Sequence, residues 1–146
     1  RELKLDVIPH VTLLAKDSSP QGRRECAIAL RHNPSPEAPT LWAELAAQHD
    51  GKDRWCLEAL GIGADKQEDK FFEAWLAKVG DKWNTPAGRD IVWRSRASKA
   101  PALLAKIITD KSTSAKDKEH YLRSLDFIKG PEKDAALVEI STSALQ

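Results

Sequence analysis

Hydrophobic residues recur along the chain at spacings of three and four, the period of one face of an α-helix. Apolar and polar positions never alternate over a useful length, so strands are not indicated. The pattern predicts nine short helices, over residues 7–15, 23–30, 41–47, 54–62, 71–79, 91–95, 103–108, 121–128 and 135–145. We therefore expect an all-α protein.

Residues typical of helix ends separate these segments. A hydroxyl group can cap free backbone N–H groups, and proline is tolerated in a first helical turn. Glycine commonly ends a helix because it adopts the left-handed conformation without strain. Helix starts are predicted at Ser35–Pro36, Thr85–Pro86, Lys99–Pro101 and, as a variant of the capping box, Ser114–Asp117, and helix ends at Gly51, Gly80 and Gly130.

The chain is similar to itself at a period of roughly 30 residues. Four stretches align without gaps: RECAIAL (24–30), RWCLEAL (54–60), DIVWRSR (90–96) and EHYLRSL (119–125). Their last position holds Leu30, Leu60 and Leu125, which we predict to be core residues, and Arg96 as the exception. Another amphipathic segment lies between each pair, which makes the unit a helical hairpin repeated about four times.

A helical hairpin cannot bury its own apolar face, so stacked neighbours must supply the core. We therefore expect one domain over residues 1–146, folded as a right-handed α-α superhelix of about four hairpins, with 135–145 as a closing helix. The two alternating sets of helices would line opposite faces, and the aligned set would form the concave one.

The stretches RRECAIAL and DRWCLEALGIGAD resemble short HEAT-like repeats of the phycobilisome-lyase type. DRWCLEALGIGAD (53–65) and WNTPAGRDIVWRSRA (83–97) are also similar to the HEAT-like segment of large bacterial membrane-bound-dehydrogenase-type proteins that also carry a c-type haem module. The chain has no CxxCH motif, so the resemblance implies no cofactor here, and it supplies no catalytic residues. It implies an extracytoplasmic, periplasmic setting and a spacer or protein-interaction role.

The nearly equal numbers of positive and negative side chains limit the kinds of partner that the sequence favours. The chain has 23 Lys and Arg against 22 Asp and Glu among 146 residues, a net charge of +1, which does not favour a nucleic-acid groove. Its longest apolar runs are far too short to span a bilayer. It begins at Arg1 and contains no Met, so we expect a fragment of a larger multidomain protein.

Tryptophans dominate the apolar stripes, and we predict Trp55, Trp75 and Trp93 to be structural core residues because large aromatics supply much of core burial. Arg96 occupies a leucine position of the repeat. A charge there must reach solvent or be paired, so we expect an ion pair with Asp65 or Asp69. The alternative is that Arg94 and Arg96 face an anionic ligand.

The arginines of the aligned helices are the candidate binding residues. Carboxylates alternate with them in the same columns, whereas a phosphate-binding groove needs charges of one sign. The candidates on the concave face are Arg24, Arg54, Arg94, Arg96 and Arg123. Anion or nucleic-acid binding, as in HEAT-like DNA glycosylases, is therefore the alternative to protein binding.

Residues for catalysis or metal binding do not converge in the sequence. Cys26 and Cys56 are one repeat apart, where helices stack about 8–10 Å from each other, so two buried thiols are expected rather than a disulfide; a redox pair is the alternative. The four histidines have no ligand spacing, so no metal is predicted. The sequence thus predicts a non-catalytic scaffold or protein–protein interaction module, with no small-molecule substrate indicated.

Overall fold

The computed structural model describes residues 5–145, and this part of the chain is all-helical, without strands. The all-α prediction is confirmed, and every predicted segment overlaps one α-helix. The helices are α1 (Ile8–Leu14), α2 (Pro20–Ala29), α3 (Ala38–Ala47), α4 (Arg54–Gly63), α5 (Glu68–Val79), α6 (Pro86–Arg94), α7 (Ala100–Thr109), α8 (Ala115–Ser124) and α9 (Pro131–Ala144), with 3-10 turns η1 (Gly80–Asn84) and η2 (Leu125–Phe127).

Polar side chains cap several helices where the sequence predicts a start. Thr85 accepts a hydrogen bond from the Gly88 amide at 3.1 Å, and Ser114 accepts one from the Asp117 amide at 3.1 Å. The start predicted at Ser35–Pro36 is wrong by two residues. The Ser35 hydroxyl accepts from the Glu37 amide in the preceding loop, and α3 begins only at Ala38.

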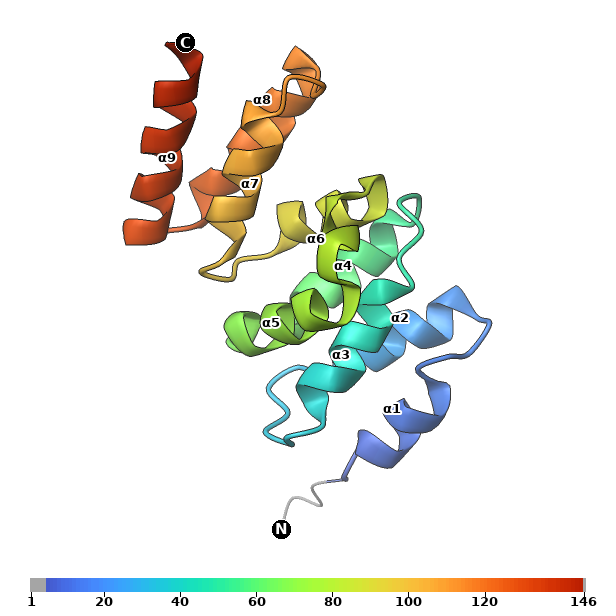
Figure 1. The fold of residues 1–146 in the computed structure, drawn as a ribbon. Helices are drawn as coiled ribbons and strands as arrows, with labels where there is room; N and C mark the ends of the chain where they lie inside the picture. Colours follow the sequence, from blue (N-terminus) through green and yellow to red (C-terminus); the bar gives the residue numbers. More distant parts are fainter. Residues whose placement is uncertain (1–4, 146) are drawn as a thin grey trace.

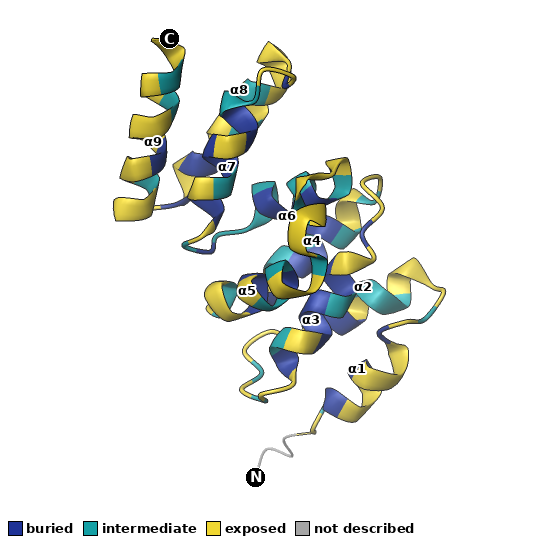
Figure 2. Cartoon of the chain, viewed as in Figure 1, coloured by how far each residue is buried: buried dark blue, intermediate teal, exposed yellow. Residues whose placement is uncertain are grey.

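Most helices pack against the helix two places along the chain, but α5 and α7 do not pack on each other. One series contains α1, α3 and α5, a second contains α2, α4, α6 and α8, and α9 packs on α7. The helices follow one another across the molecule, so that α1 and α9 lie at opposite ends (Figure 1). Buried residues gather where helices face each other, and the outer sides of α1 and α9 are largely exposed (Figure 2).

The core contains the three leucines that the sequence alignment places at one position. Leu30, Leu60 and Leu125, its shared last position, are almost completely buried, and so is Trp75. Phe71 on α5 packs with Trp42 of α3 at a ring-centroid distance of 5.7 Å. The apolar faces therefore point inward as the periodicity predicts.

Two of the three predicted core tryptophans differ from expectation. Trp55 is 74% exposed, so the core prediction for it is wrong: Leu57 and Leu60 turn the opposite side of α4 inward. Trp93 is half-buried and packs against the edge of the core. Its indole stacks on His120 of α8 with centroids 4.6 Å apart, and its Nε1 donates to the His120 carbonyl oxygen at 3.2 Å.

Helices α2 and α4 approach closely because a glycine lies at their crossing. Gly63 is in the last turn of α4, and a Cβ atom there would overlap the Ala27 carbonyl oxygen on α2. Gly61, one position before Ile62, similarly faces the Arg94 guanidinium. The GIG stretch therefore serves helix packing.

Candidate interaction surface

Exposed apolar side chains collect on the outer surface of α2 and α4. Ile28 of α2 is 44% exposed, and Trp55 and Ile62 of α4 are 74% and 41% exposed. They line one shallow groove, which we call the Trp55 groove, together with Ala59 at its base and Gln21, Arg24, Glu25 and Glu58 at its rim. An apolar surface with a charged rim is the general form of a protein-binding site.

One carboxylate both starts α4 and fixes it to α2. Asp53 accepts a hydrogen bond from the Cys56 amide at 3.1 Å as the N-cap of α4, and it accepts one from Arg24 Nη1 at 3.2 Å. Because the cap sets where the helix begins, Trp55 lies in the first turn of α4. Its indole is held at the surface by a helix that is tied to its neighbour.

Three of the five arginines predicted to bind a partner already form ion pairs with carboxylates. Arg24 pairs with Asp53 at 3.2 Å, Arg94 with Glu58 at 3.3 Å, and Arg123 with Glu119 at 2.6 Å. Arg54 is exposed and has no ion pair within residues 5–145. Since phosphate binding depends on net positive charge, this arrangement favours an apolar partner over a nucleic-acid backbone.

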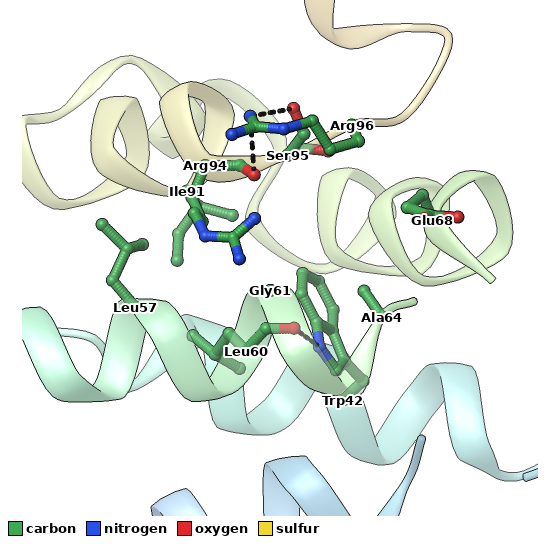
Figure 3. Close-up of a pocket in the computed structure, with 10 residues that line it drawn as sticks. All are labelled: Trp42, Leu57, Leu60, Gly61, Ala64, Glu68, Ile91, Arg94, Ser95 and Arg96. Carbon is green, nitrogen blue, oxygen red and sulfur yellow. Dashed lines mark hydrogen bonds between the residues drawn. The ribbon is translucent and has the colours of Figure 1, made fainter. Parts of the chain in front are cut away.

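Arg96 does not form the predicted ion pair. Its Nη1 donates to the carbonyl oxygens of Arg94 and Ser95 at 3.0 and 3.2 Å (Figure 3) and to that of Trp93 at 3.2 Å. Its guanidinium lies 4.5 Å from the centre of the Phe127 ring. Helix α6 ends at Arg94, so carbonyl groups of its last turn need donors from outside the helix. Burial, followed by repulsion from Arg94, lowers the pKa of Arg96.

The expected carboxylate partners of Arg96 have other roles. Asp65 accepts from Arg31 at 3.0 Å and lies 2.8 Å from His32 Nε2, and these contacts lower its pKa. Asp69 accepts a hydrogen bond from the Ser98 amide at 2.7 Å. Asp65 therefore ties the loop after α4 to the loop after α2, and Asp69, in the first turn of α5, holds the loop after α6.

A small cavity beneath Arg94 and Arg96 separates α4 from α6 (Figure 3). Its volume is ≈ 20 Å³, room for about one or two water molecules. Trp42 closes one side, with its Nε1 donating to the Leu60 carbonyl oxygen at 3.0 Å. A space of this size is a packing imperfection between two helices and does not take an organic ligand.

Both cysteines are free thiols. Cys26 is buried, and burial, with the nearby carboxylates of Asp17 and Glu25, raises its pKa. A raised pKa keeps this thiol protonated and a poor nucleophile. Cys56 is half-buried, although both thiols are expected to be buried from their equivalent repeat positions.

Residues 5–145 contain neither a metal-binding cluster nor a membrane-spanning helix. No group of three or more His, Cys, Asp or Glu side chains is placed to hold a metal ion. None of the helices there has the length and apolar character needed to cross a membrane.

Comparisons with protein-family models, with curated proteins and with solved structures gave no match to this chain. The HEAT-like resemblance therefore stays a prediction that rests on the repeat pattern.

Trp55 is the surface residue that the sequence prediction missed, yet the repeat alignment contains a signal for it. Its alignment column holds Glu25 on α2 and His120 on α8, both polar and exposed, while Ile91 on α6 is the buried member. An indole in a column that is polar and exposed on two of the other three helices is a candidate surface anchor.

Proposed function

We propose that the chain is a non-catalytic protein-interaction or scaffold module whose partner binds at the Trp55 groove. The observation that carries the proposal is the exposure of Trp55 between Ile28 and Ile62 on two helices held together by the Arg24–Asp53 pair. Tryptophan is strongly enriched among the residues that dominate binding energy at interfaces. Leaving 74% of an indole in water is unfavourable unless a partner covers it.

We propose a HEAT-like, right-handed solenoid of about four helical hairpins as the architecture of the module. The packing of α1 on α3, α3 on α5 and α7 on α9, and of α2, α4, α6 and α8 in series, supports this arrangement, together with the self-similarity of the second series. In solenoids, long surfaces along one series of helices are the usual binding surfaces. A bacterial, extracytoplasmic parent protein with additional domains is the setting that the resemblance implies.

Binding of an anion or a nucleic acid is the weaker alternative, because three of the candidate arginines already form ion pairs with carboxylates of this chain. A phosphate chain would have to displace Asp53, Glu58 and Glu119 to reach them. Binding at the Trp55 groove is instead expected to depend little on salt, since its contacts are apolar and its rim carries both charges.

The test uses the whole chain as bait in a lysate of the organism that encodes it, at low and at moderate salt, with capture read by mass spectrometry. Trp55→Ala is compared with Val138→Ala, a control with a similarly exposed apolar residue on α9. We expect one defined protein to be retained at both salt concentrations by the wild type and by Val138→Ala. Capture by Trp55→Ala should fall about tenfold or more.

The proposal fails if Trp55→Ala captures the same protein as well as the wild type does, or if the wild type captures no defined protein. Recovery of nucleic acid that disappears at moderate salt would instead support the arginine alternative. Circular dichroism and a melting temperature establish that Trp55→Ala remains folded.

A further inference from the structure

The apolar residues of the Trp55 groove follow the spacing of one helix face. Trp55, Ala59 and Ile62 on α4 are separated by four and then three residues, so they form one stripe about 10 Å long. Ile28 of α2 forms the facing wall. A partner that covers this stripe must therefore present apolar side chains over about two helical turns.

The walls of the groove are helices and offer no strand edge. The backbone groups of α2 and α4 bond within their own helices, and residues 5–145 contain no strand. An extended peptide binds mainly through main-chain hydrogen bonds to an open sheet edge, so here it would bury unpaired backbone groups against an apolar surface. A helix satisfies its backbone groups internally and can bury one apolar face without that loss.

The opposite side of the same two helices already accepts a helix. Helix α3 contacts both α2 and α4, and Trp42 of α3 donates from its Nε1 to the Leu60 carbonyl oxygen of α4 at 3.0 Å. Side chains on a helix form ridges, and a neighbouring helix packs into the grooves between them. The Trp55 groove presents the same two helices on their exposed side, where no helix of residues 5–145 covers them.

The rim of the groove has one sign of charge in excess. Arg24 and Glu58 are already engaged in the ion pairs that join α2 to α4 and α4 to α6. Glu25 is exposed and forms no ion pair within residues 5–145, and the unpaired Arg54 does not line the groove. The rim therefore carries a net negative charge, which a basic side chain on the partner would complement.

We propose, on the basis of the function proposed above, that the partner segment bound in the Trp55 groove is an amphipathic α-helix. Its apolar side chains recur at positions i, i+3 or i+4, and i+7 and pack between Trp55, Ile28 and Ile62, and a Lys or Arg at its edge faces Glu25. The apolar contacts supply most of the affinity, because an ion pair at an exposed rim contributes little.

Peptide selection tests the proposal without knowledge of the natural partner. A phage-displayed library of random peptides of about 16 residues, enough for four helical turns, is selected on the whole chain. Peptides that also bind Trp55→Ala are removed. We expect the remaining sequences to share the i, i+3 or i+4, i+7 apolar spacing together with a basic residue.

A synthetic copy of an enriched peptide tests whether it binds as a helix. Circular dichroism should show a gain of helix when the peptide binds the chain. A proline at the centre of the peptide should weaken binding about tenfold or more, because it breaks the helix.

A charge exchange tests the predicted contact at Glu25. Glu25→Lys should weaken binding of the basic peptide about threefold, and a peptide with Glu in place of its basic residue should recover this loss. Glu139→Lys, an exposed carboxylate on α9, makes the same change in net charge and should have no effect. Equal effects of the two substitutions would overturn the assignment of a basic residue opposite Glu25.

The helical partner is overturned if no Trp55-dependent peptide is enriched, if the enriched peptides lack the spacing, if they bind without gaining helix, or if the central proline leaves the affinity unchanged. Where capture from the lysate still depends on Trp55, these results leave the proposed function in place. Capture that does not depend on Trp55 removes the proposed function itself. Self-association of the wild type but not of Trp55→Ala in sedimentation velocity would assign the groove to a second copy and also overturn the helical partner.

Discussion

The helix pairs α2–α4 and α6–α8 are packed together by different kinds of side chain. Between α2 and α4, Gly63 allows the backbones to approach until it meets the Ala27 carbonyl group. Between α6 and α8, the Trp93 indole fills the gap by stacking on His120, and Ser124 Oγ donates to the Trp93 carbonyl oxygen at 2.6 Å. The α4 residue aligned with Trp93 is the buried Leu57, and the tryptophan of α4, Trp55, is exposed to solvent.

Two tryptophans of neighbouring helices thus have different surroundings. Trp93 packs between α6 and α8, whereas Trp55 contacts mainly solvent at the surface of α4. Substitutions can break the close α2–α4 contact, the His49–Asp90 contact between the loop after α3 and α6, and the aromatic α6–α8 contact.

The largest expected effect comes from Gly63→Ala. The new Cβ meets backbone rather than a movable side chain, so α2 and α4 must separate, and we expect the free energy of unfolding to fall by about 3 kcal/mol. Urea unfolding followed by circular dichroism measures it.

Gly22→Ala is the matched control for Gly63→Ala. This glycine also lies in a helix, but a Cβ there meets only ordinary contacts at 3.7 Å or more. Alanine is a better helix former, so the variant should be unchanged or more stable by up to about 1 kcal/mol. Equal destabilisation by both substitutions would show that Gly63 is not a point of close approach.

The His49–Asp90 pair makes stability depend on pH. The pKa of His49 is about 9 in the folded protein against an ordinary value of 6.5, so its contribution is complete below pH 6.5 and is lost as the pH rises toward 9. The loss is at most about 3 kcal/mol. Urea unfolding across this pH range measures it.

The pH experiment needs a control variant that changes a neighbour of His49 and keeps the His49–Asp90 pair. Asp90 comes from α6, Cys56 from α4, and Asp50 from the adjoining loop. Cys56→Ser keeps the His49–Asp90 pair and removes the thiol, so most of the dependence should remain. His49→Gln should remove it, and a slope that persists in His49→Gln would assign the effect to other groups.

A smaller effect is expected at Trp93. Because the indole is only half-buried, Trp93→Ala should cost about 2 kcal/mol, less than for a fully buried tryptophan. Trp55→Ala should cost about 0.5 kcal/mol or less, since its indole contacts mainly solvent. Thermal unfolding of the two variants side by side measures the difference in stability. An equal loss of stability in both variants would contradict the view that Trp93 packs between helices while Trp55 lies at the surface.

Much of the fold follows from local signals in the sequence. The three-and-four spacing places every helix, and the caps at Thr85 and Ser114 act over only three residues, which makes them readable from sequence. The shared leucine position is also readable, because Leu30, Leu60 and Leu125 repeat one packing environment.

The features that were missed depend on partners far apart in the chain. Arg96 finds backbone carbonyl groups because α6 ends early, and its expected partners are occupied by other groups. His49 meets Asp90, 41 residues away, without a counterpart in the other repeats. Trp55 was placed in the core because periodicity shows that a face is apolar but not which apolar residue lies at its edge.

The distribution of indoles also gives the chain an optical property. Trp42 and Trp75 are buried and Trp83 and Trp93 are half-buried, which leaves Trp55 as the one largely exposed indole of the five. Iodide added to the solution should therefore quench a red-shifted fraction of the fluorescence that belongs mainly to this residue. A bound partner would shield that fraction, so occupancy of the groove can be followed without any label.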